Sequence, residues 1–163
     1  MSSPKVPSRR VAAGSQDPGY RLVSVSRLSE LCNPFANPPW EDVAGLTIEG
    51  VRDAIKDGLR KTQAYSADAH ASQWTVEDHI ARIAHLATVG WVDPIHVDVG
   101  IPFMSCWVDW PLLDGNHRMA AAMVRGDARI LASVAGCCQH MREVLGRSLK
   151  PKAPPAHAAP WTP

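Results

Sequence analysis

The chain has 163 residues, which is the length of one domain with short extensions at its ends. Its 45% hydrophobic and 20% charged residues are typical of a globular protein and exclude wholesale disorder. The formal net charge of +1 excludes a global attraction to nucleic acid, so any such binding requires a local basic patch.

The two ends of the chain differ in composition from its middle. Residues 1–19 are rich in Pro, Gly and basic residues, and residues 149–163 repeat Pro and Ala. Neither segment can bury enough apolar surface to offset its chain entropy. We therefore expect a flexible N-terminal tail over 1–19, one folded domain over 20–148, and an extended C-terminal tail over 149–163.

No segment of the sequence is typical of a membrane span or an export signal. The apolar runs stay well short of the roughly 20 residues that cross a bilayer. The first residues also lack the apolar stretch of a signal peptide. We expect no membrane insertion and a cytoplasmic location.

The first elements of the domain are predicted to be a strand, a loop and a helix. Alternating apolar residues over 20–28 predict a strand, and three prolines forbid regular structure over 33–40. We interpret 33–40 as a structured loop or a partner-facing arm. From Thr47, an expected N-cap, apolar residues recur at helical spacing and predict a helix over 48–61.

The next elements have clearer end signals. Residues 75–78 fit a capping box, apolar residues follow at helical spacing, and Gly90 ends the helix. Pro94 opens a strand in which apolar and polar residues alternate over 95–99. A returning strand is predicted over 106–113.

The stretch LLDGNHRMAAAMVRGD, residues 112–127, joins the returning strand to a helix. Asp-Gly turns the chain at 114–115, the helix is predicted over 116–125, and Gly-Asp at 126–127 ends it. A last strand over 128–134 and a short helix over 138–145 follow. The order of elements predicts an α/β (α+β) domain, a small mixed sheet packed by helices.

The start of the helix over 116–125 has the properties of an anion site. A strand that runs through Gly115 into a helix presents free backbone N–H groups at the positive end of the helix dipole. Asp114 or Asn116 can cap the helix, and Arg118 supplies a forked donor suited to phosphate. Arg125, seven residues later, lies on nearly the same helix face. We predict phosphate binding by Gly115, Asn116, Arg118 and Arg125; the alternative is an ordinary turn followed by solvated arginines.

Other polar and aromatic residues form weaker candidate sites. His96 and Asp98 project from one strand face, where they could orient an imidazole or bind a metal, although exposed strand faces carry such pairs routinely. Trp107 and Trp110 could stack nucleic-acid bases, or fill the core or a partner interface. His79 and His85 are six residues apart on a helix and point in different directions, so we expect no joint metal site.

The cysteines do not have the spacing of a metal site. Neighbouring residues 137 and 138 are not a CxxC pair, and no second pair matches a zinc-ligand pattern. We expect free, mostly buried thiols at Cys32, Cys106, Cys137 and Cys138.

Residues 76–136 resemble the superfamily that joins the ParB N-terminal domain with sulfiredoxin. The resemblance covers the amphipathic helix, a Gly-Trp-x-x-Pro-Ile entry into a strand at 90–95, the returning strand, and Asp-Gly-Asn-His-Arg-x-Ala-Ala at 114–121. In ParB-like members this box holds nucleotide phosphates, and in sulfiredoxins a similar box carries the catalytic cysteine. Asn116 takes the place of that cysteine here, so sulfiredoxin chemistry has no nucleophile.

The Asp-Gly-Asn-His-Arg form of the box is similar to a branch found on plasmids and mobile elements. Some of its members are nucleases or nucleoside triphosphatases that act in fertility inhibition or oncogenic suppression. The resemblance implies a bacterial protein that binds DNA and ATP or another nucleoside triphosphate. It also implies hydrolysis of phosphodiester or phosphoanhydride bonds with Mg²⁺ or Mn²⁺.

The same resemblance gives three residues catalytic roles. Arg118 would neutralise the charge that develops in phosphoryl transfer, His117 would act as general acid or base, and Asp114 would hold the metal. Two other functions stay open. One is a non-catalytic protein that binds a conjugation or type IV secretion component through 33–40 and the tails. The other is a nucleotide-gated DNA binder without hydrolysis.

Overall fold

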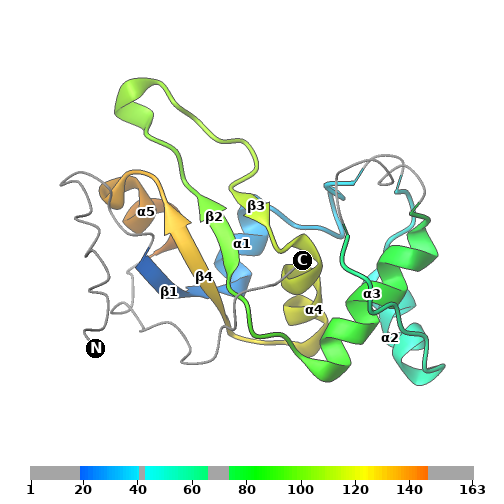
Figure 1. Ribbon diagram of the computed structural model, residues 1–163. Coiled ribbons are helices and arrows are strands. Elements are labelled where there is room, and N and C mark those ends of the chain that lie inside the picture. The colour runs from blue at the N-terminus through cyan, green and yellow to red at the C-terminus, as the bar shows by residue number, and fades with distance from the viewer. Residues whose placement is uncertain (1–18, 41–42, 66–73, 147–163) are drawn as a thin grey trace, which may run out of the picture.

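The computed structural model describes residues 19–40, 43–65 and 74–146. Within these ranges the chain forms a mixed sheet packed by helices, which confirms the α+β prediction (Figure 1). The predicted tails lie outside the described residues, except that Gly19 already belongs to the first strand. None of the helices in the described ranges is long and apolar enough to cross a bilayer.

The sheet has the strand order β1-β4-β2-β3. β1 runs antiparallel to β4, β4 runs parallel to β2, and β2 runs antiparallel to β3. The pairing of β2 with β3 shifts register between His96 and Val97, where His96 pairs with Asp114. The strands are β1 (Gly19–Ser24), β2 (Ile95–Asp98), β3 (Leu112–Asp114) and β4 (Arg129–Ala135).

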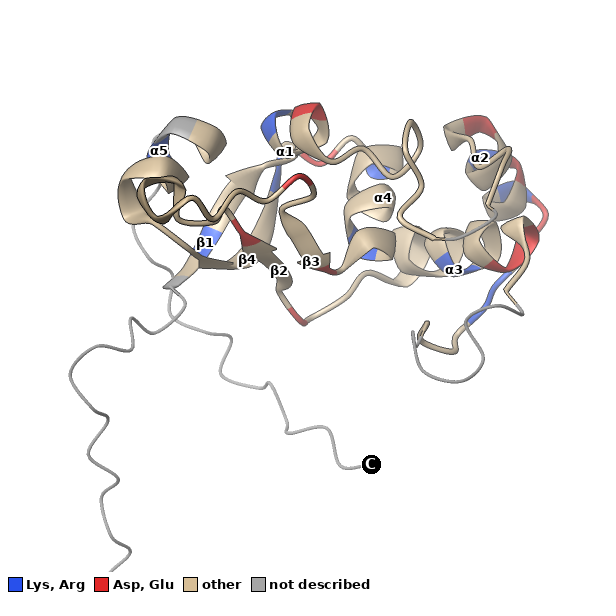
Figure 2. Cartoon of the chain, turned by 90° about the horizontal axis from the view of Figure 1, so that it is seen from above, with Lys and Arg blue, Asp and Glu red and all other residues tan. Residues whose placement is uncertain are grey.

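The helices divide into a group on the sheet and a pair beside it. Figure 2 shows α1, α4 and α5 on one face of the sheet, while α2 and α3 lie beyond β3, next to α4. The helices are α1 (Val25–Leu31), α2 (Ile48–Lys56), α3 (Val76–Val89), α4 (Asn116–Arg125) and α5 (Cys138–Leu145).

Local end signals fix most of these helices. The hydroxyl of Thr47 accepts a hydrogen bond from the Gly50 N–H at the start of α2. Thr75 and Asp78 form the predicted capping box of α3, and the helix ends at Gly90. The bounds of α4 and α5 agree with the prediction, and β4 begins and ends one residue later than predicted.

Two N-terminal predictions were too long. The strand expected over 20–28 ends at Ser24, whose hydroxyl accepts a hydrogen bond from the Arg27 N–H and so begins α1. The helix expected over 48–61 ends at Lys56, because Gly58 adopts a positive φ of 73° that a helix cannot continue through.

The returning strand predicted over 106–113 is also wrong in its extent. β3 covers only Leu112–Asp114, and Cys106 forms a single bridge with Ile101. A 3-10 turn at Pro102–Met104 lies between Ile101 and Cys106. After Cys106 the chain is irregular through Pro111, which has no N–H to donate to a β-ladder.

The apolar core has two clusters, with α4 between them. Met119 and Ala122 pack into a cluster with the sheet, whereas Ala120 and Ala121 pack into a second cluster with α2 and α3. The small alanine side chains allow close packing on both sides, not on the sheet side alone as predicted. The position of α4 is therefore fixed from two directions.

Candidate functional site

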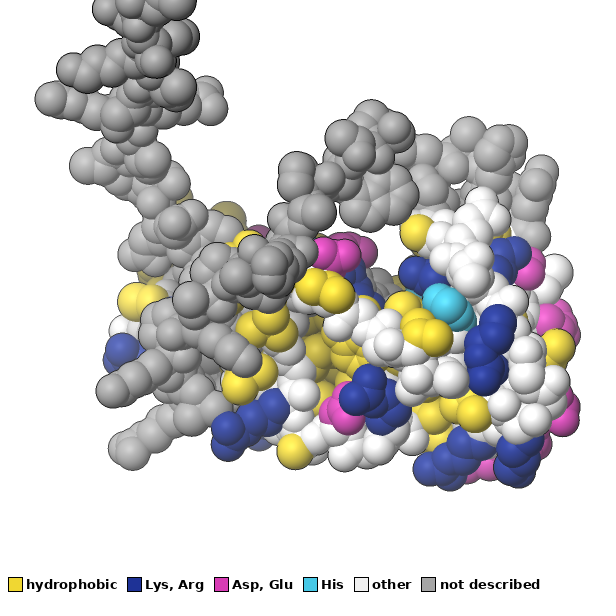
Figure 3. All heavy atoms as spheres, turned by 60° about the horizontal axis from the view of Figure 1, so that its bottom comes forward, with side chains coloured by type: hydrophobic (Ala, Val, Ile, Leu, Met, Phe, Trp, Pro, Cys, Tyr) yellow, Lys and Arg dark blue, Asp and Glu magenta, His cyan; other side chains and the backbone are white. Residues whose placement is uncertain are grey.

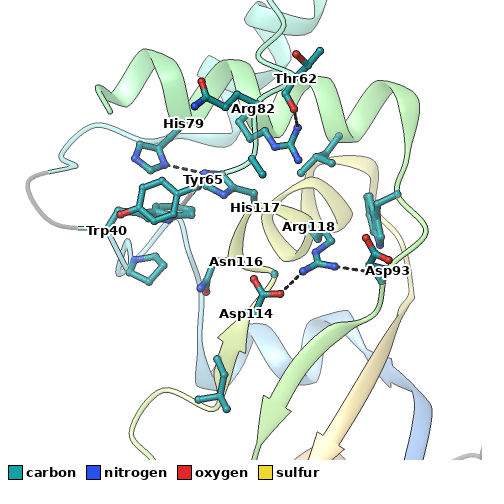
Figure 4. A pocket seen from close by; sticks show the side chains of 17 residues that line it. Trp40, Thr62, Tyr65, His79, Arg82, Asp93, Asp114, Asn116, His117 and Arg118 are labelled. Atoms are coloured by element: carbon teal, nitrogen blue, oxygen red, sulfur yellow. Dashed lines mark hydrogen bonds and ion pairs between the residues drawn. The ribbon is translucent and has the colours of Figure 1, made fainter. Parts of the chain in front are cut away.

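A cavity of about 1010 Å³ opens beside the start of α4. Its walls come from α3, from the β3–α4 junction, and from the segments at 39–40 and 62–65 (Figure 4). Trp91, which packs against both core clusters, also lines it. The cavity therefore lies beside the place where the two core clusters meet.

Gly115 forms the junction between β3 and α4 and is the N-cap of the helix. Its φ of 96° lies in the left-handed region, and a Cβ atom there would lie 2.5 Å from Cγ2 of Ile95. Only glycine satisfies both constraints. No side chain caps α4, so the prediction that Asp114 or Asn116 caps it is wrong. The first backbone N–H groups of α4 lack intrahelical acceptors and stay available to a ligand.

Both predicted capping side chains have other partners. The side-chain oxygen of Asn116 accepts a hydrogen bond from Nε1 of Trp110, at 3.1 Å. The carboxylate of Asp114 accepts one from Arg118, at 2.6 Å. Trp110 thus holds the side chain of Asn116 in the Asp-Gly-Asn-His-Arg box. Trp107, in contrast, is 69% exposed.

Arg118 is held in place and is not a solvated surface arginine. Its side chain is 15% exposed and pairs with the carboxylate of Asp114. The same guanidinium donates to the backbone carbonyls of Asp93, at 3.1 Å, and Pro94, at 2.9 Å. These contacts join α4 to the segment that enters β2 and fix a forked donor on the cavity wall.

A second arginine, which the sequence interpretation missed, faces the same cavity from α3. Arg82 donates to the carbonyl of Thr62 at 2.5 Å and to that of Lys61 at 3.4 Å. Burial lowers the pKa of its guanidinium, and the neighbouring charge of Arg118 lowers it further. Both guanidiniums therefore belong to the wall of one cavity.

Two histidines form a buried pair in the cavity wall. Nδ1 of His79 and Nε2 of His117 are 2.9 Å apart, and the planes of the rings differ by 11°. His79 is 1% exposed and His117 is 9% exposed. The indole of Trp40 packs on both, with ring centroids 4.4 Å from each. His117 of α4 and His79 of α3 thus join the two helices inside the cavity wall.

Both histidines are neutral near pH 7. Burial lowers the pKa of His79 to about 4; Asp78 opposes this shift and Lys61 adds to it. Burial also lowers the pKa of His117 well below its usual value, and His79, Arg82 and Arg118 lower it further. A neutral imidazole with a depressed pKa does not supply a proton as a general acid at neutral pH.

The structure does not bring Arg125 to this cavity. It lies at the far end of α4, where its Nε is 3.3 Å from the carboxylate of Asp127. Its guanidinium lies over the ring of Trp91, 5.2 Å from the centroid. Of the predicted phosphate ligands, Gly115, Asn116 and Arg118 line the cavity.

Two carboxylates, Asp93 and Asp114, lie on the side of the cavity that carries Arg118. In the described part of the chain, no three His, Cys, Asp or Glu residues are grouped as ligands of a metal ion. One or two carboxylates are nevertheless what Mg²⁺ commonly takes from a protein when a substrate's phosphates supply further oxygens. The donor set fits a metal of that kind.

The remaining candidate residues have structural positions. Asp98 accepts a hydrogen bond from the Gly100 N–H at 2.8 Å, which shapes the turn after β2, and His96 is exposed. The expectation of mostly buried thiols is wrong, because only Cys32 is buried; Cys137 is partly exposed, and Cys106 and Cys138 are exposed.

The segment 33–40 is a loop, as predicted, and its ends pack inward. Pro34 and Trp40 are buried, and the side-chain oxygen of Asn33 accepts a hydrogen bond from the Phe35 N–H. Trp40 lines the cavity. The loop is thus a wall of the site, which weakens its interpretation as a free contact arm.

Basic side chains also gather outside the cavity. Figure 3 shows Lys and Arg side chains over the part of the molecule that contains α2 and α3. Within this part, Arg60 and Arg82 both lower the pKa of His85, after its burial. Acidic side chains lie among these basic ones, because Lys56 pairs with Asp53 and Arg52 with Glu49, so the charge on this part of the surface is mixed.

Comparisons with protein-family models, curated proteins and solved structures give no match to this chain. The geometry of the cavity is therefore the main guide to its chemistry.

Proposed function

We propose that the chain binds the phosphate groups of a nucleoside triphosphate in the cavity at the start of α4. One observation carries this proposal: Arg82, Arg118 and the first turn of α4 line the same cavity. Forked guanidinium donors and a helix N-terminus are the groups with which proteins bind phosphate. The cavity volume also lies at the upper end of the range of ligand pockets, about 300–1000 Å³.

We further propose that the protein hydrolyses a phosphoanhydride or phosphodiester bond with Mg²⁺ or Mn²⁺. A phosphate on Arg118 would replace the carboxylate of Asp114, which the structure holds there at 2.6 Å. The released carboxylate and that of Asp93 would then hold the metal. Bound metal would offset phosphate charge and activate water. Arg82 and Arg118 would stabilise charge that develops on the phosphoryl oxygens.

The resemblance to the ParB/sulfiredoxin superfamily supports the same function. The order of α3, β2, β3, box, α4 and β4 is consistent with a ParB/sulfiredoxin-like fold. From the plasmid branch we take DNA as a second ligand and fertility inhibition, or interference with DNA transfer in the bacterial cytoplasm, as the biological role. The basic side chains near α2 and α3 are the surface for that DNA.

Nucleotide titration by calorimetry tests the binding step. ATP, and in parallel the other nucleoside triphosphates, should bind the unaltered chain and bind far more weakly to Arg118→Ala and Arg82→Ala. Arg125→Ala is the matched control, because this arginine lies on the same helix outside the cavity. Binding that all three variants retain would refute a phosphate site at this position.

Release of phosphate from ATP and cleavage of plasmid DNA, each with Mg²⁺ or Mn²⁺, test the hydrolysis step on the same preparations. Turnover that is lost in Arg118→Ala supports the enzyme. Tight nucleotide binding without turnover would instead indicate a nucleotide-gated DNA binder.

The alternative of a non-catalytic protein that binds a conjugation or type IV secretion component rests on the resemblance alone. It predicts capture of such a component that survives Arg118→Ala. Deleting 33–40 would not test it, because the deletion removes buried Pro34 and Trp40 from the core.

A further inference from the structure

We propose that the His79–His117 pair takes up one proton when a doubly charged anion, such as a terminal phosphate, enters the cavity. This proton would make the cavity prefer such anions to singly charged phosphodiesters. The inference rests on the proposed function, because it concerns the same cavity, and it names both the class of ligand and two residues that select it.

The hydrogen bond between the rings allows one added proton and resists a second. Two neutral imidazoles carry one proton each, and one of these lies between Nδ1 of His79 and Nε2 of His117, which are 2.9 Å apart. A proton added from water to a ring nitrogen outside this bond gives an imidazolium that donates to a neutral ring. The bond becomes charge-assisted and stronger. A second added proton would place an N–H on both of the facing nitrogens, so that neither could accept the hydrogen bond.

The aromatic rings around the pair favour a positive charge there. Trp40 packs on both imidazoles with centroids 4.4 Å away, and its plane is tilted by only 30° from that of His117. Tyr65 and Trp74 lie within 5.3 to 5.9 Å of the same rings. The faces of aromatic rings attract cations, so this cage lowers the cost of an imidazolium.

Burial is the main cause that keeps the pair neutral, and the charged side chains around it change the size of this effect. From α4, Arg118 acts on His117, and from α3, Arg82 does the same. Lys61 and Asp78, which pair with each other at 2.6 Å, act on His79 in opposite senses. Tyr65 also packs against both rings.

An anion between Arg82 and Arg118 offsets the repulsion that these two guanidiniums add to the effect of burial. The pKa of the pair therefore rises on binding, and binding takes up a proton at any pH between the free and bound values. The charge on the anion decides how far the pKa rises. A singly charged diester offsets one guanidinium, whereas a doubly charged group offsets both.

Sulfate and dimethyl phosphate separate these two cases, because neither changes its charge between pH 6 and pH 8. Calorimetry on the full chain, in two buffers with different ionisation enthalpies, measures proton uptake directly. Sulfate should bind with net proton uptake at pH 6 and more tightly at pH 6 than at pH 8. Uptake of one full proton strengthens binding about tenfold for each unit by which the pH falls, so the measured uptake sets the expected slope. Dimethyl phosphate should take up fewer protons than sulfate and depend less on pH.

Three outcomes would overturn parts of this scheme in a distinguishable way. Sulfate binding without proton uptake would refute the inference and leave the phosphate site intact. Equal proton uptake with both anions would refute the selection by charge. If neither sulfate nor ATP bound, the proposed function and the inference would fall together.

Two variants and one spectroscopic measurement assign the proton to this pair. His79→Gln keeps a hydrogen-bonding side chain without a titratable group, and it should lose proton uptake while still binding sulfate. His85→Gln, on the same helix outside the cavity, should change nothing. If His79→Gln does not fold, nitrogen NMR of the unaltered protein decides: sulfate at pH 6 should move one ring to the imidazolium resonance, and two neutral rings would refute the proposal.

Discussion

The two ends of α4 carry an arginine each, but the surroundings of these ends differ. At the C-terminal end, the Gly126 N–H donates to the carbonyls of Ala122 and Met123, and Arg125 pairs with Asp127 beside it. At the N-terminal end, Gly115 offers no side-chain cap and the residues of the first turn line a cavity. The chain satisfies its own polar groups at one end and leaves donors for a ligand at the other.

This difference shows why spacing along a helix is an incomplete guide to a site. Arg118 and Arg125 are seven residues apart, which places them on nearly the same face but about 10 Å apart along the axis. Arg82, from another helix, is the cation that joins Arg118 at the cavity. The residues of one site can come from different helices that pack together, and regular spacing along a single helix does not identify them.

The largest expected effect distinguishes the two glycines of α4. Both have positive φ, but a Cβ at Gly115 would lie 2.5 Å from Ile95, whereas at Gly126 it would meet nothing within 4 Å. Gly115→Ala should lower the free energy of unfolding by roughly 2–5 kcal/mol, from strain and overpacking together. Gly126→Ala, the control, should cost only about 1 kcal/mol. Equal losses in urea denaturation would contradict the comparison.

The second effect concerns acid pH and the buried histidines near the N-terminal end. An unfolded histidine binds a proton below about pH 6.5, whereas His79 resists protonation until about pH 4. The free energy of unfolding should therefore be highest above pH 6.5 and fall by up to about 3 kcal/mol as the pH drops to 4.

Urea denaturation at several pH values measures this loss. His79→Gln should reduce this loss, with the part that belongs to His117 remaining, and the reduction should be far larger than for His85→Gln. Because Lys61 holds the pKa of Asp78 below its usual range, the loss from that carboxylate falls at a lower pH and is separable. A flat curve for the unaltered protein in this window would refute neutral burial.

The third effect is on ligand binding. Arg118→Ala removes a charged, forked donor and should weaken sulfate or ATP binding about 10- to 100-fold, the equivalent of roughly 1.5–3 kcal/mol. Arg118→Lys keeps the charge but not the three contacts of the guanidinium, so it should bind at an intermediate strength. Calorimetry at constant ionic strength measures all three proteins, and full affinity in the alanine variant would contradict the assignment.

The smallest effect belongs to the other arginine of α4. Arg125→Ala breaks a half-exposed ion pair with Asp127 and a contact with Trp91, and such surface contacts are worth about 1 kcal/mol or less. Its affinity for sulfate should stay within about twofold of the unaltered protein, less than 0.5 kcal/mol. A loss as large as that of Arg118→Ala would show that both ends of α4 bind the ligand.

The sequence predicts the elements whose end signals are local. Thr75 and Gly90 bound α3, Gly126 ends α4, and in each case the signal lies within a few residues of the boundary. The length of β3 depends instead on pairing with β2, which is distant in the sequence. Its first expected half separates from the sheet after the turn at Pro102, so alternation alone predicted too long a strand.

Half of the site could be predicted in the same way. The box at Gly115 and Arg118 is contiguous, so its glycine and arginine point to an anion without any tertiary information. His79 and Arg82 come from α3, far earlier in the chain, and only one signal marks them: two polar residues three apart that lie close to an apolar helix face. Their meeting with His117 and Arg118 depends on how α3 packs on α4, which no local pattern contains.

Cys32 can report on the opening of the apolar core beside α1. Its thiol is buried between α1 and the sheet cluster, donates to the Leu28 carbonyl, and has a pKa that burial raises to about 12. Alkylating reagents attack thiolates, so in the folded chain they will modify exposed Cys106 and Cys138 first. The slower labelling of Cys32 then measures how often the core beside α1 opens.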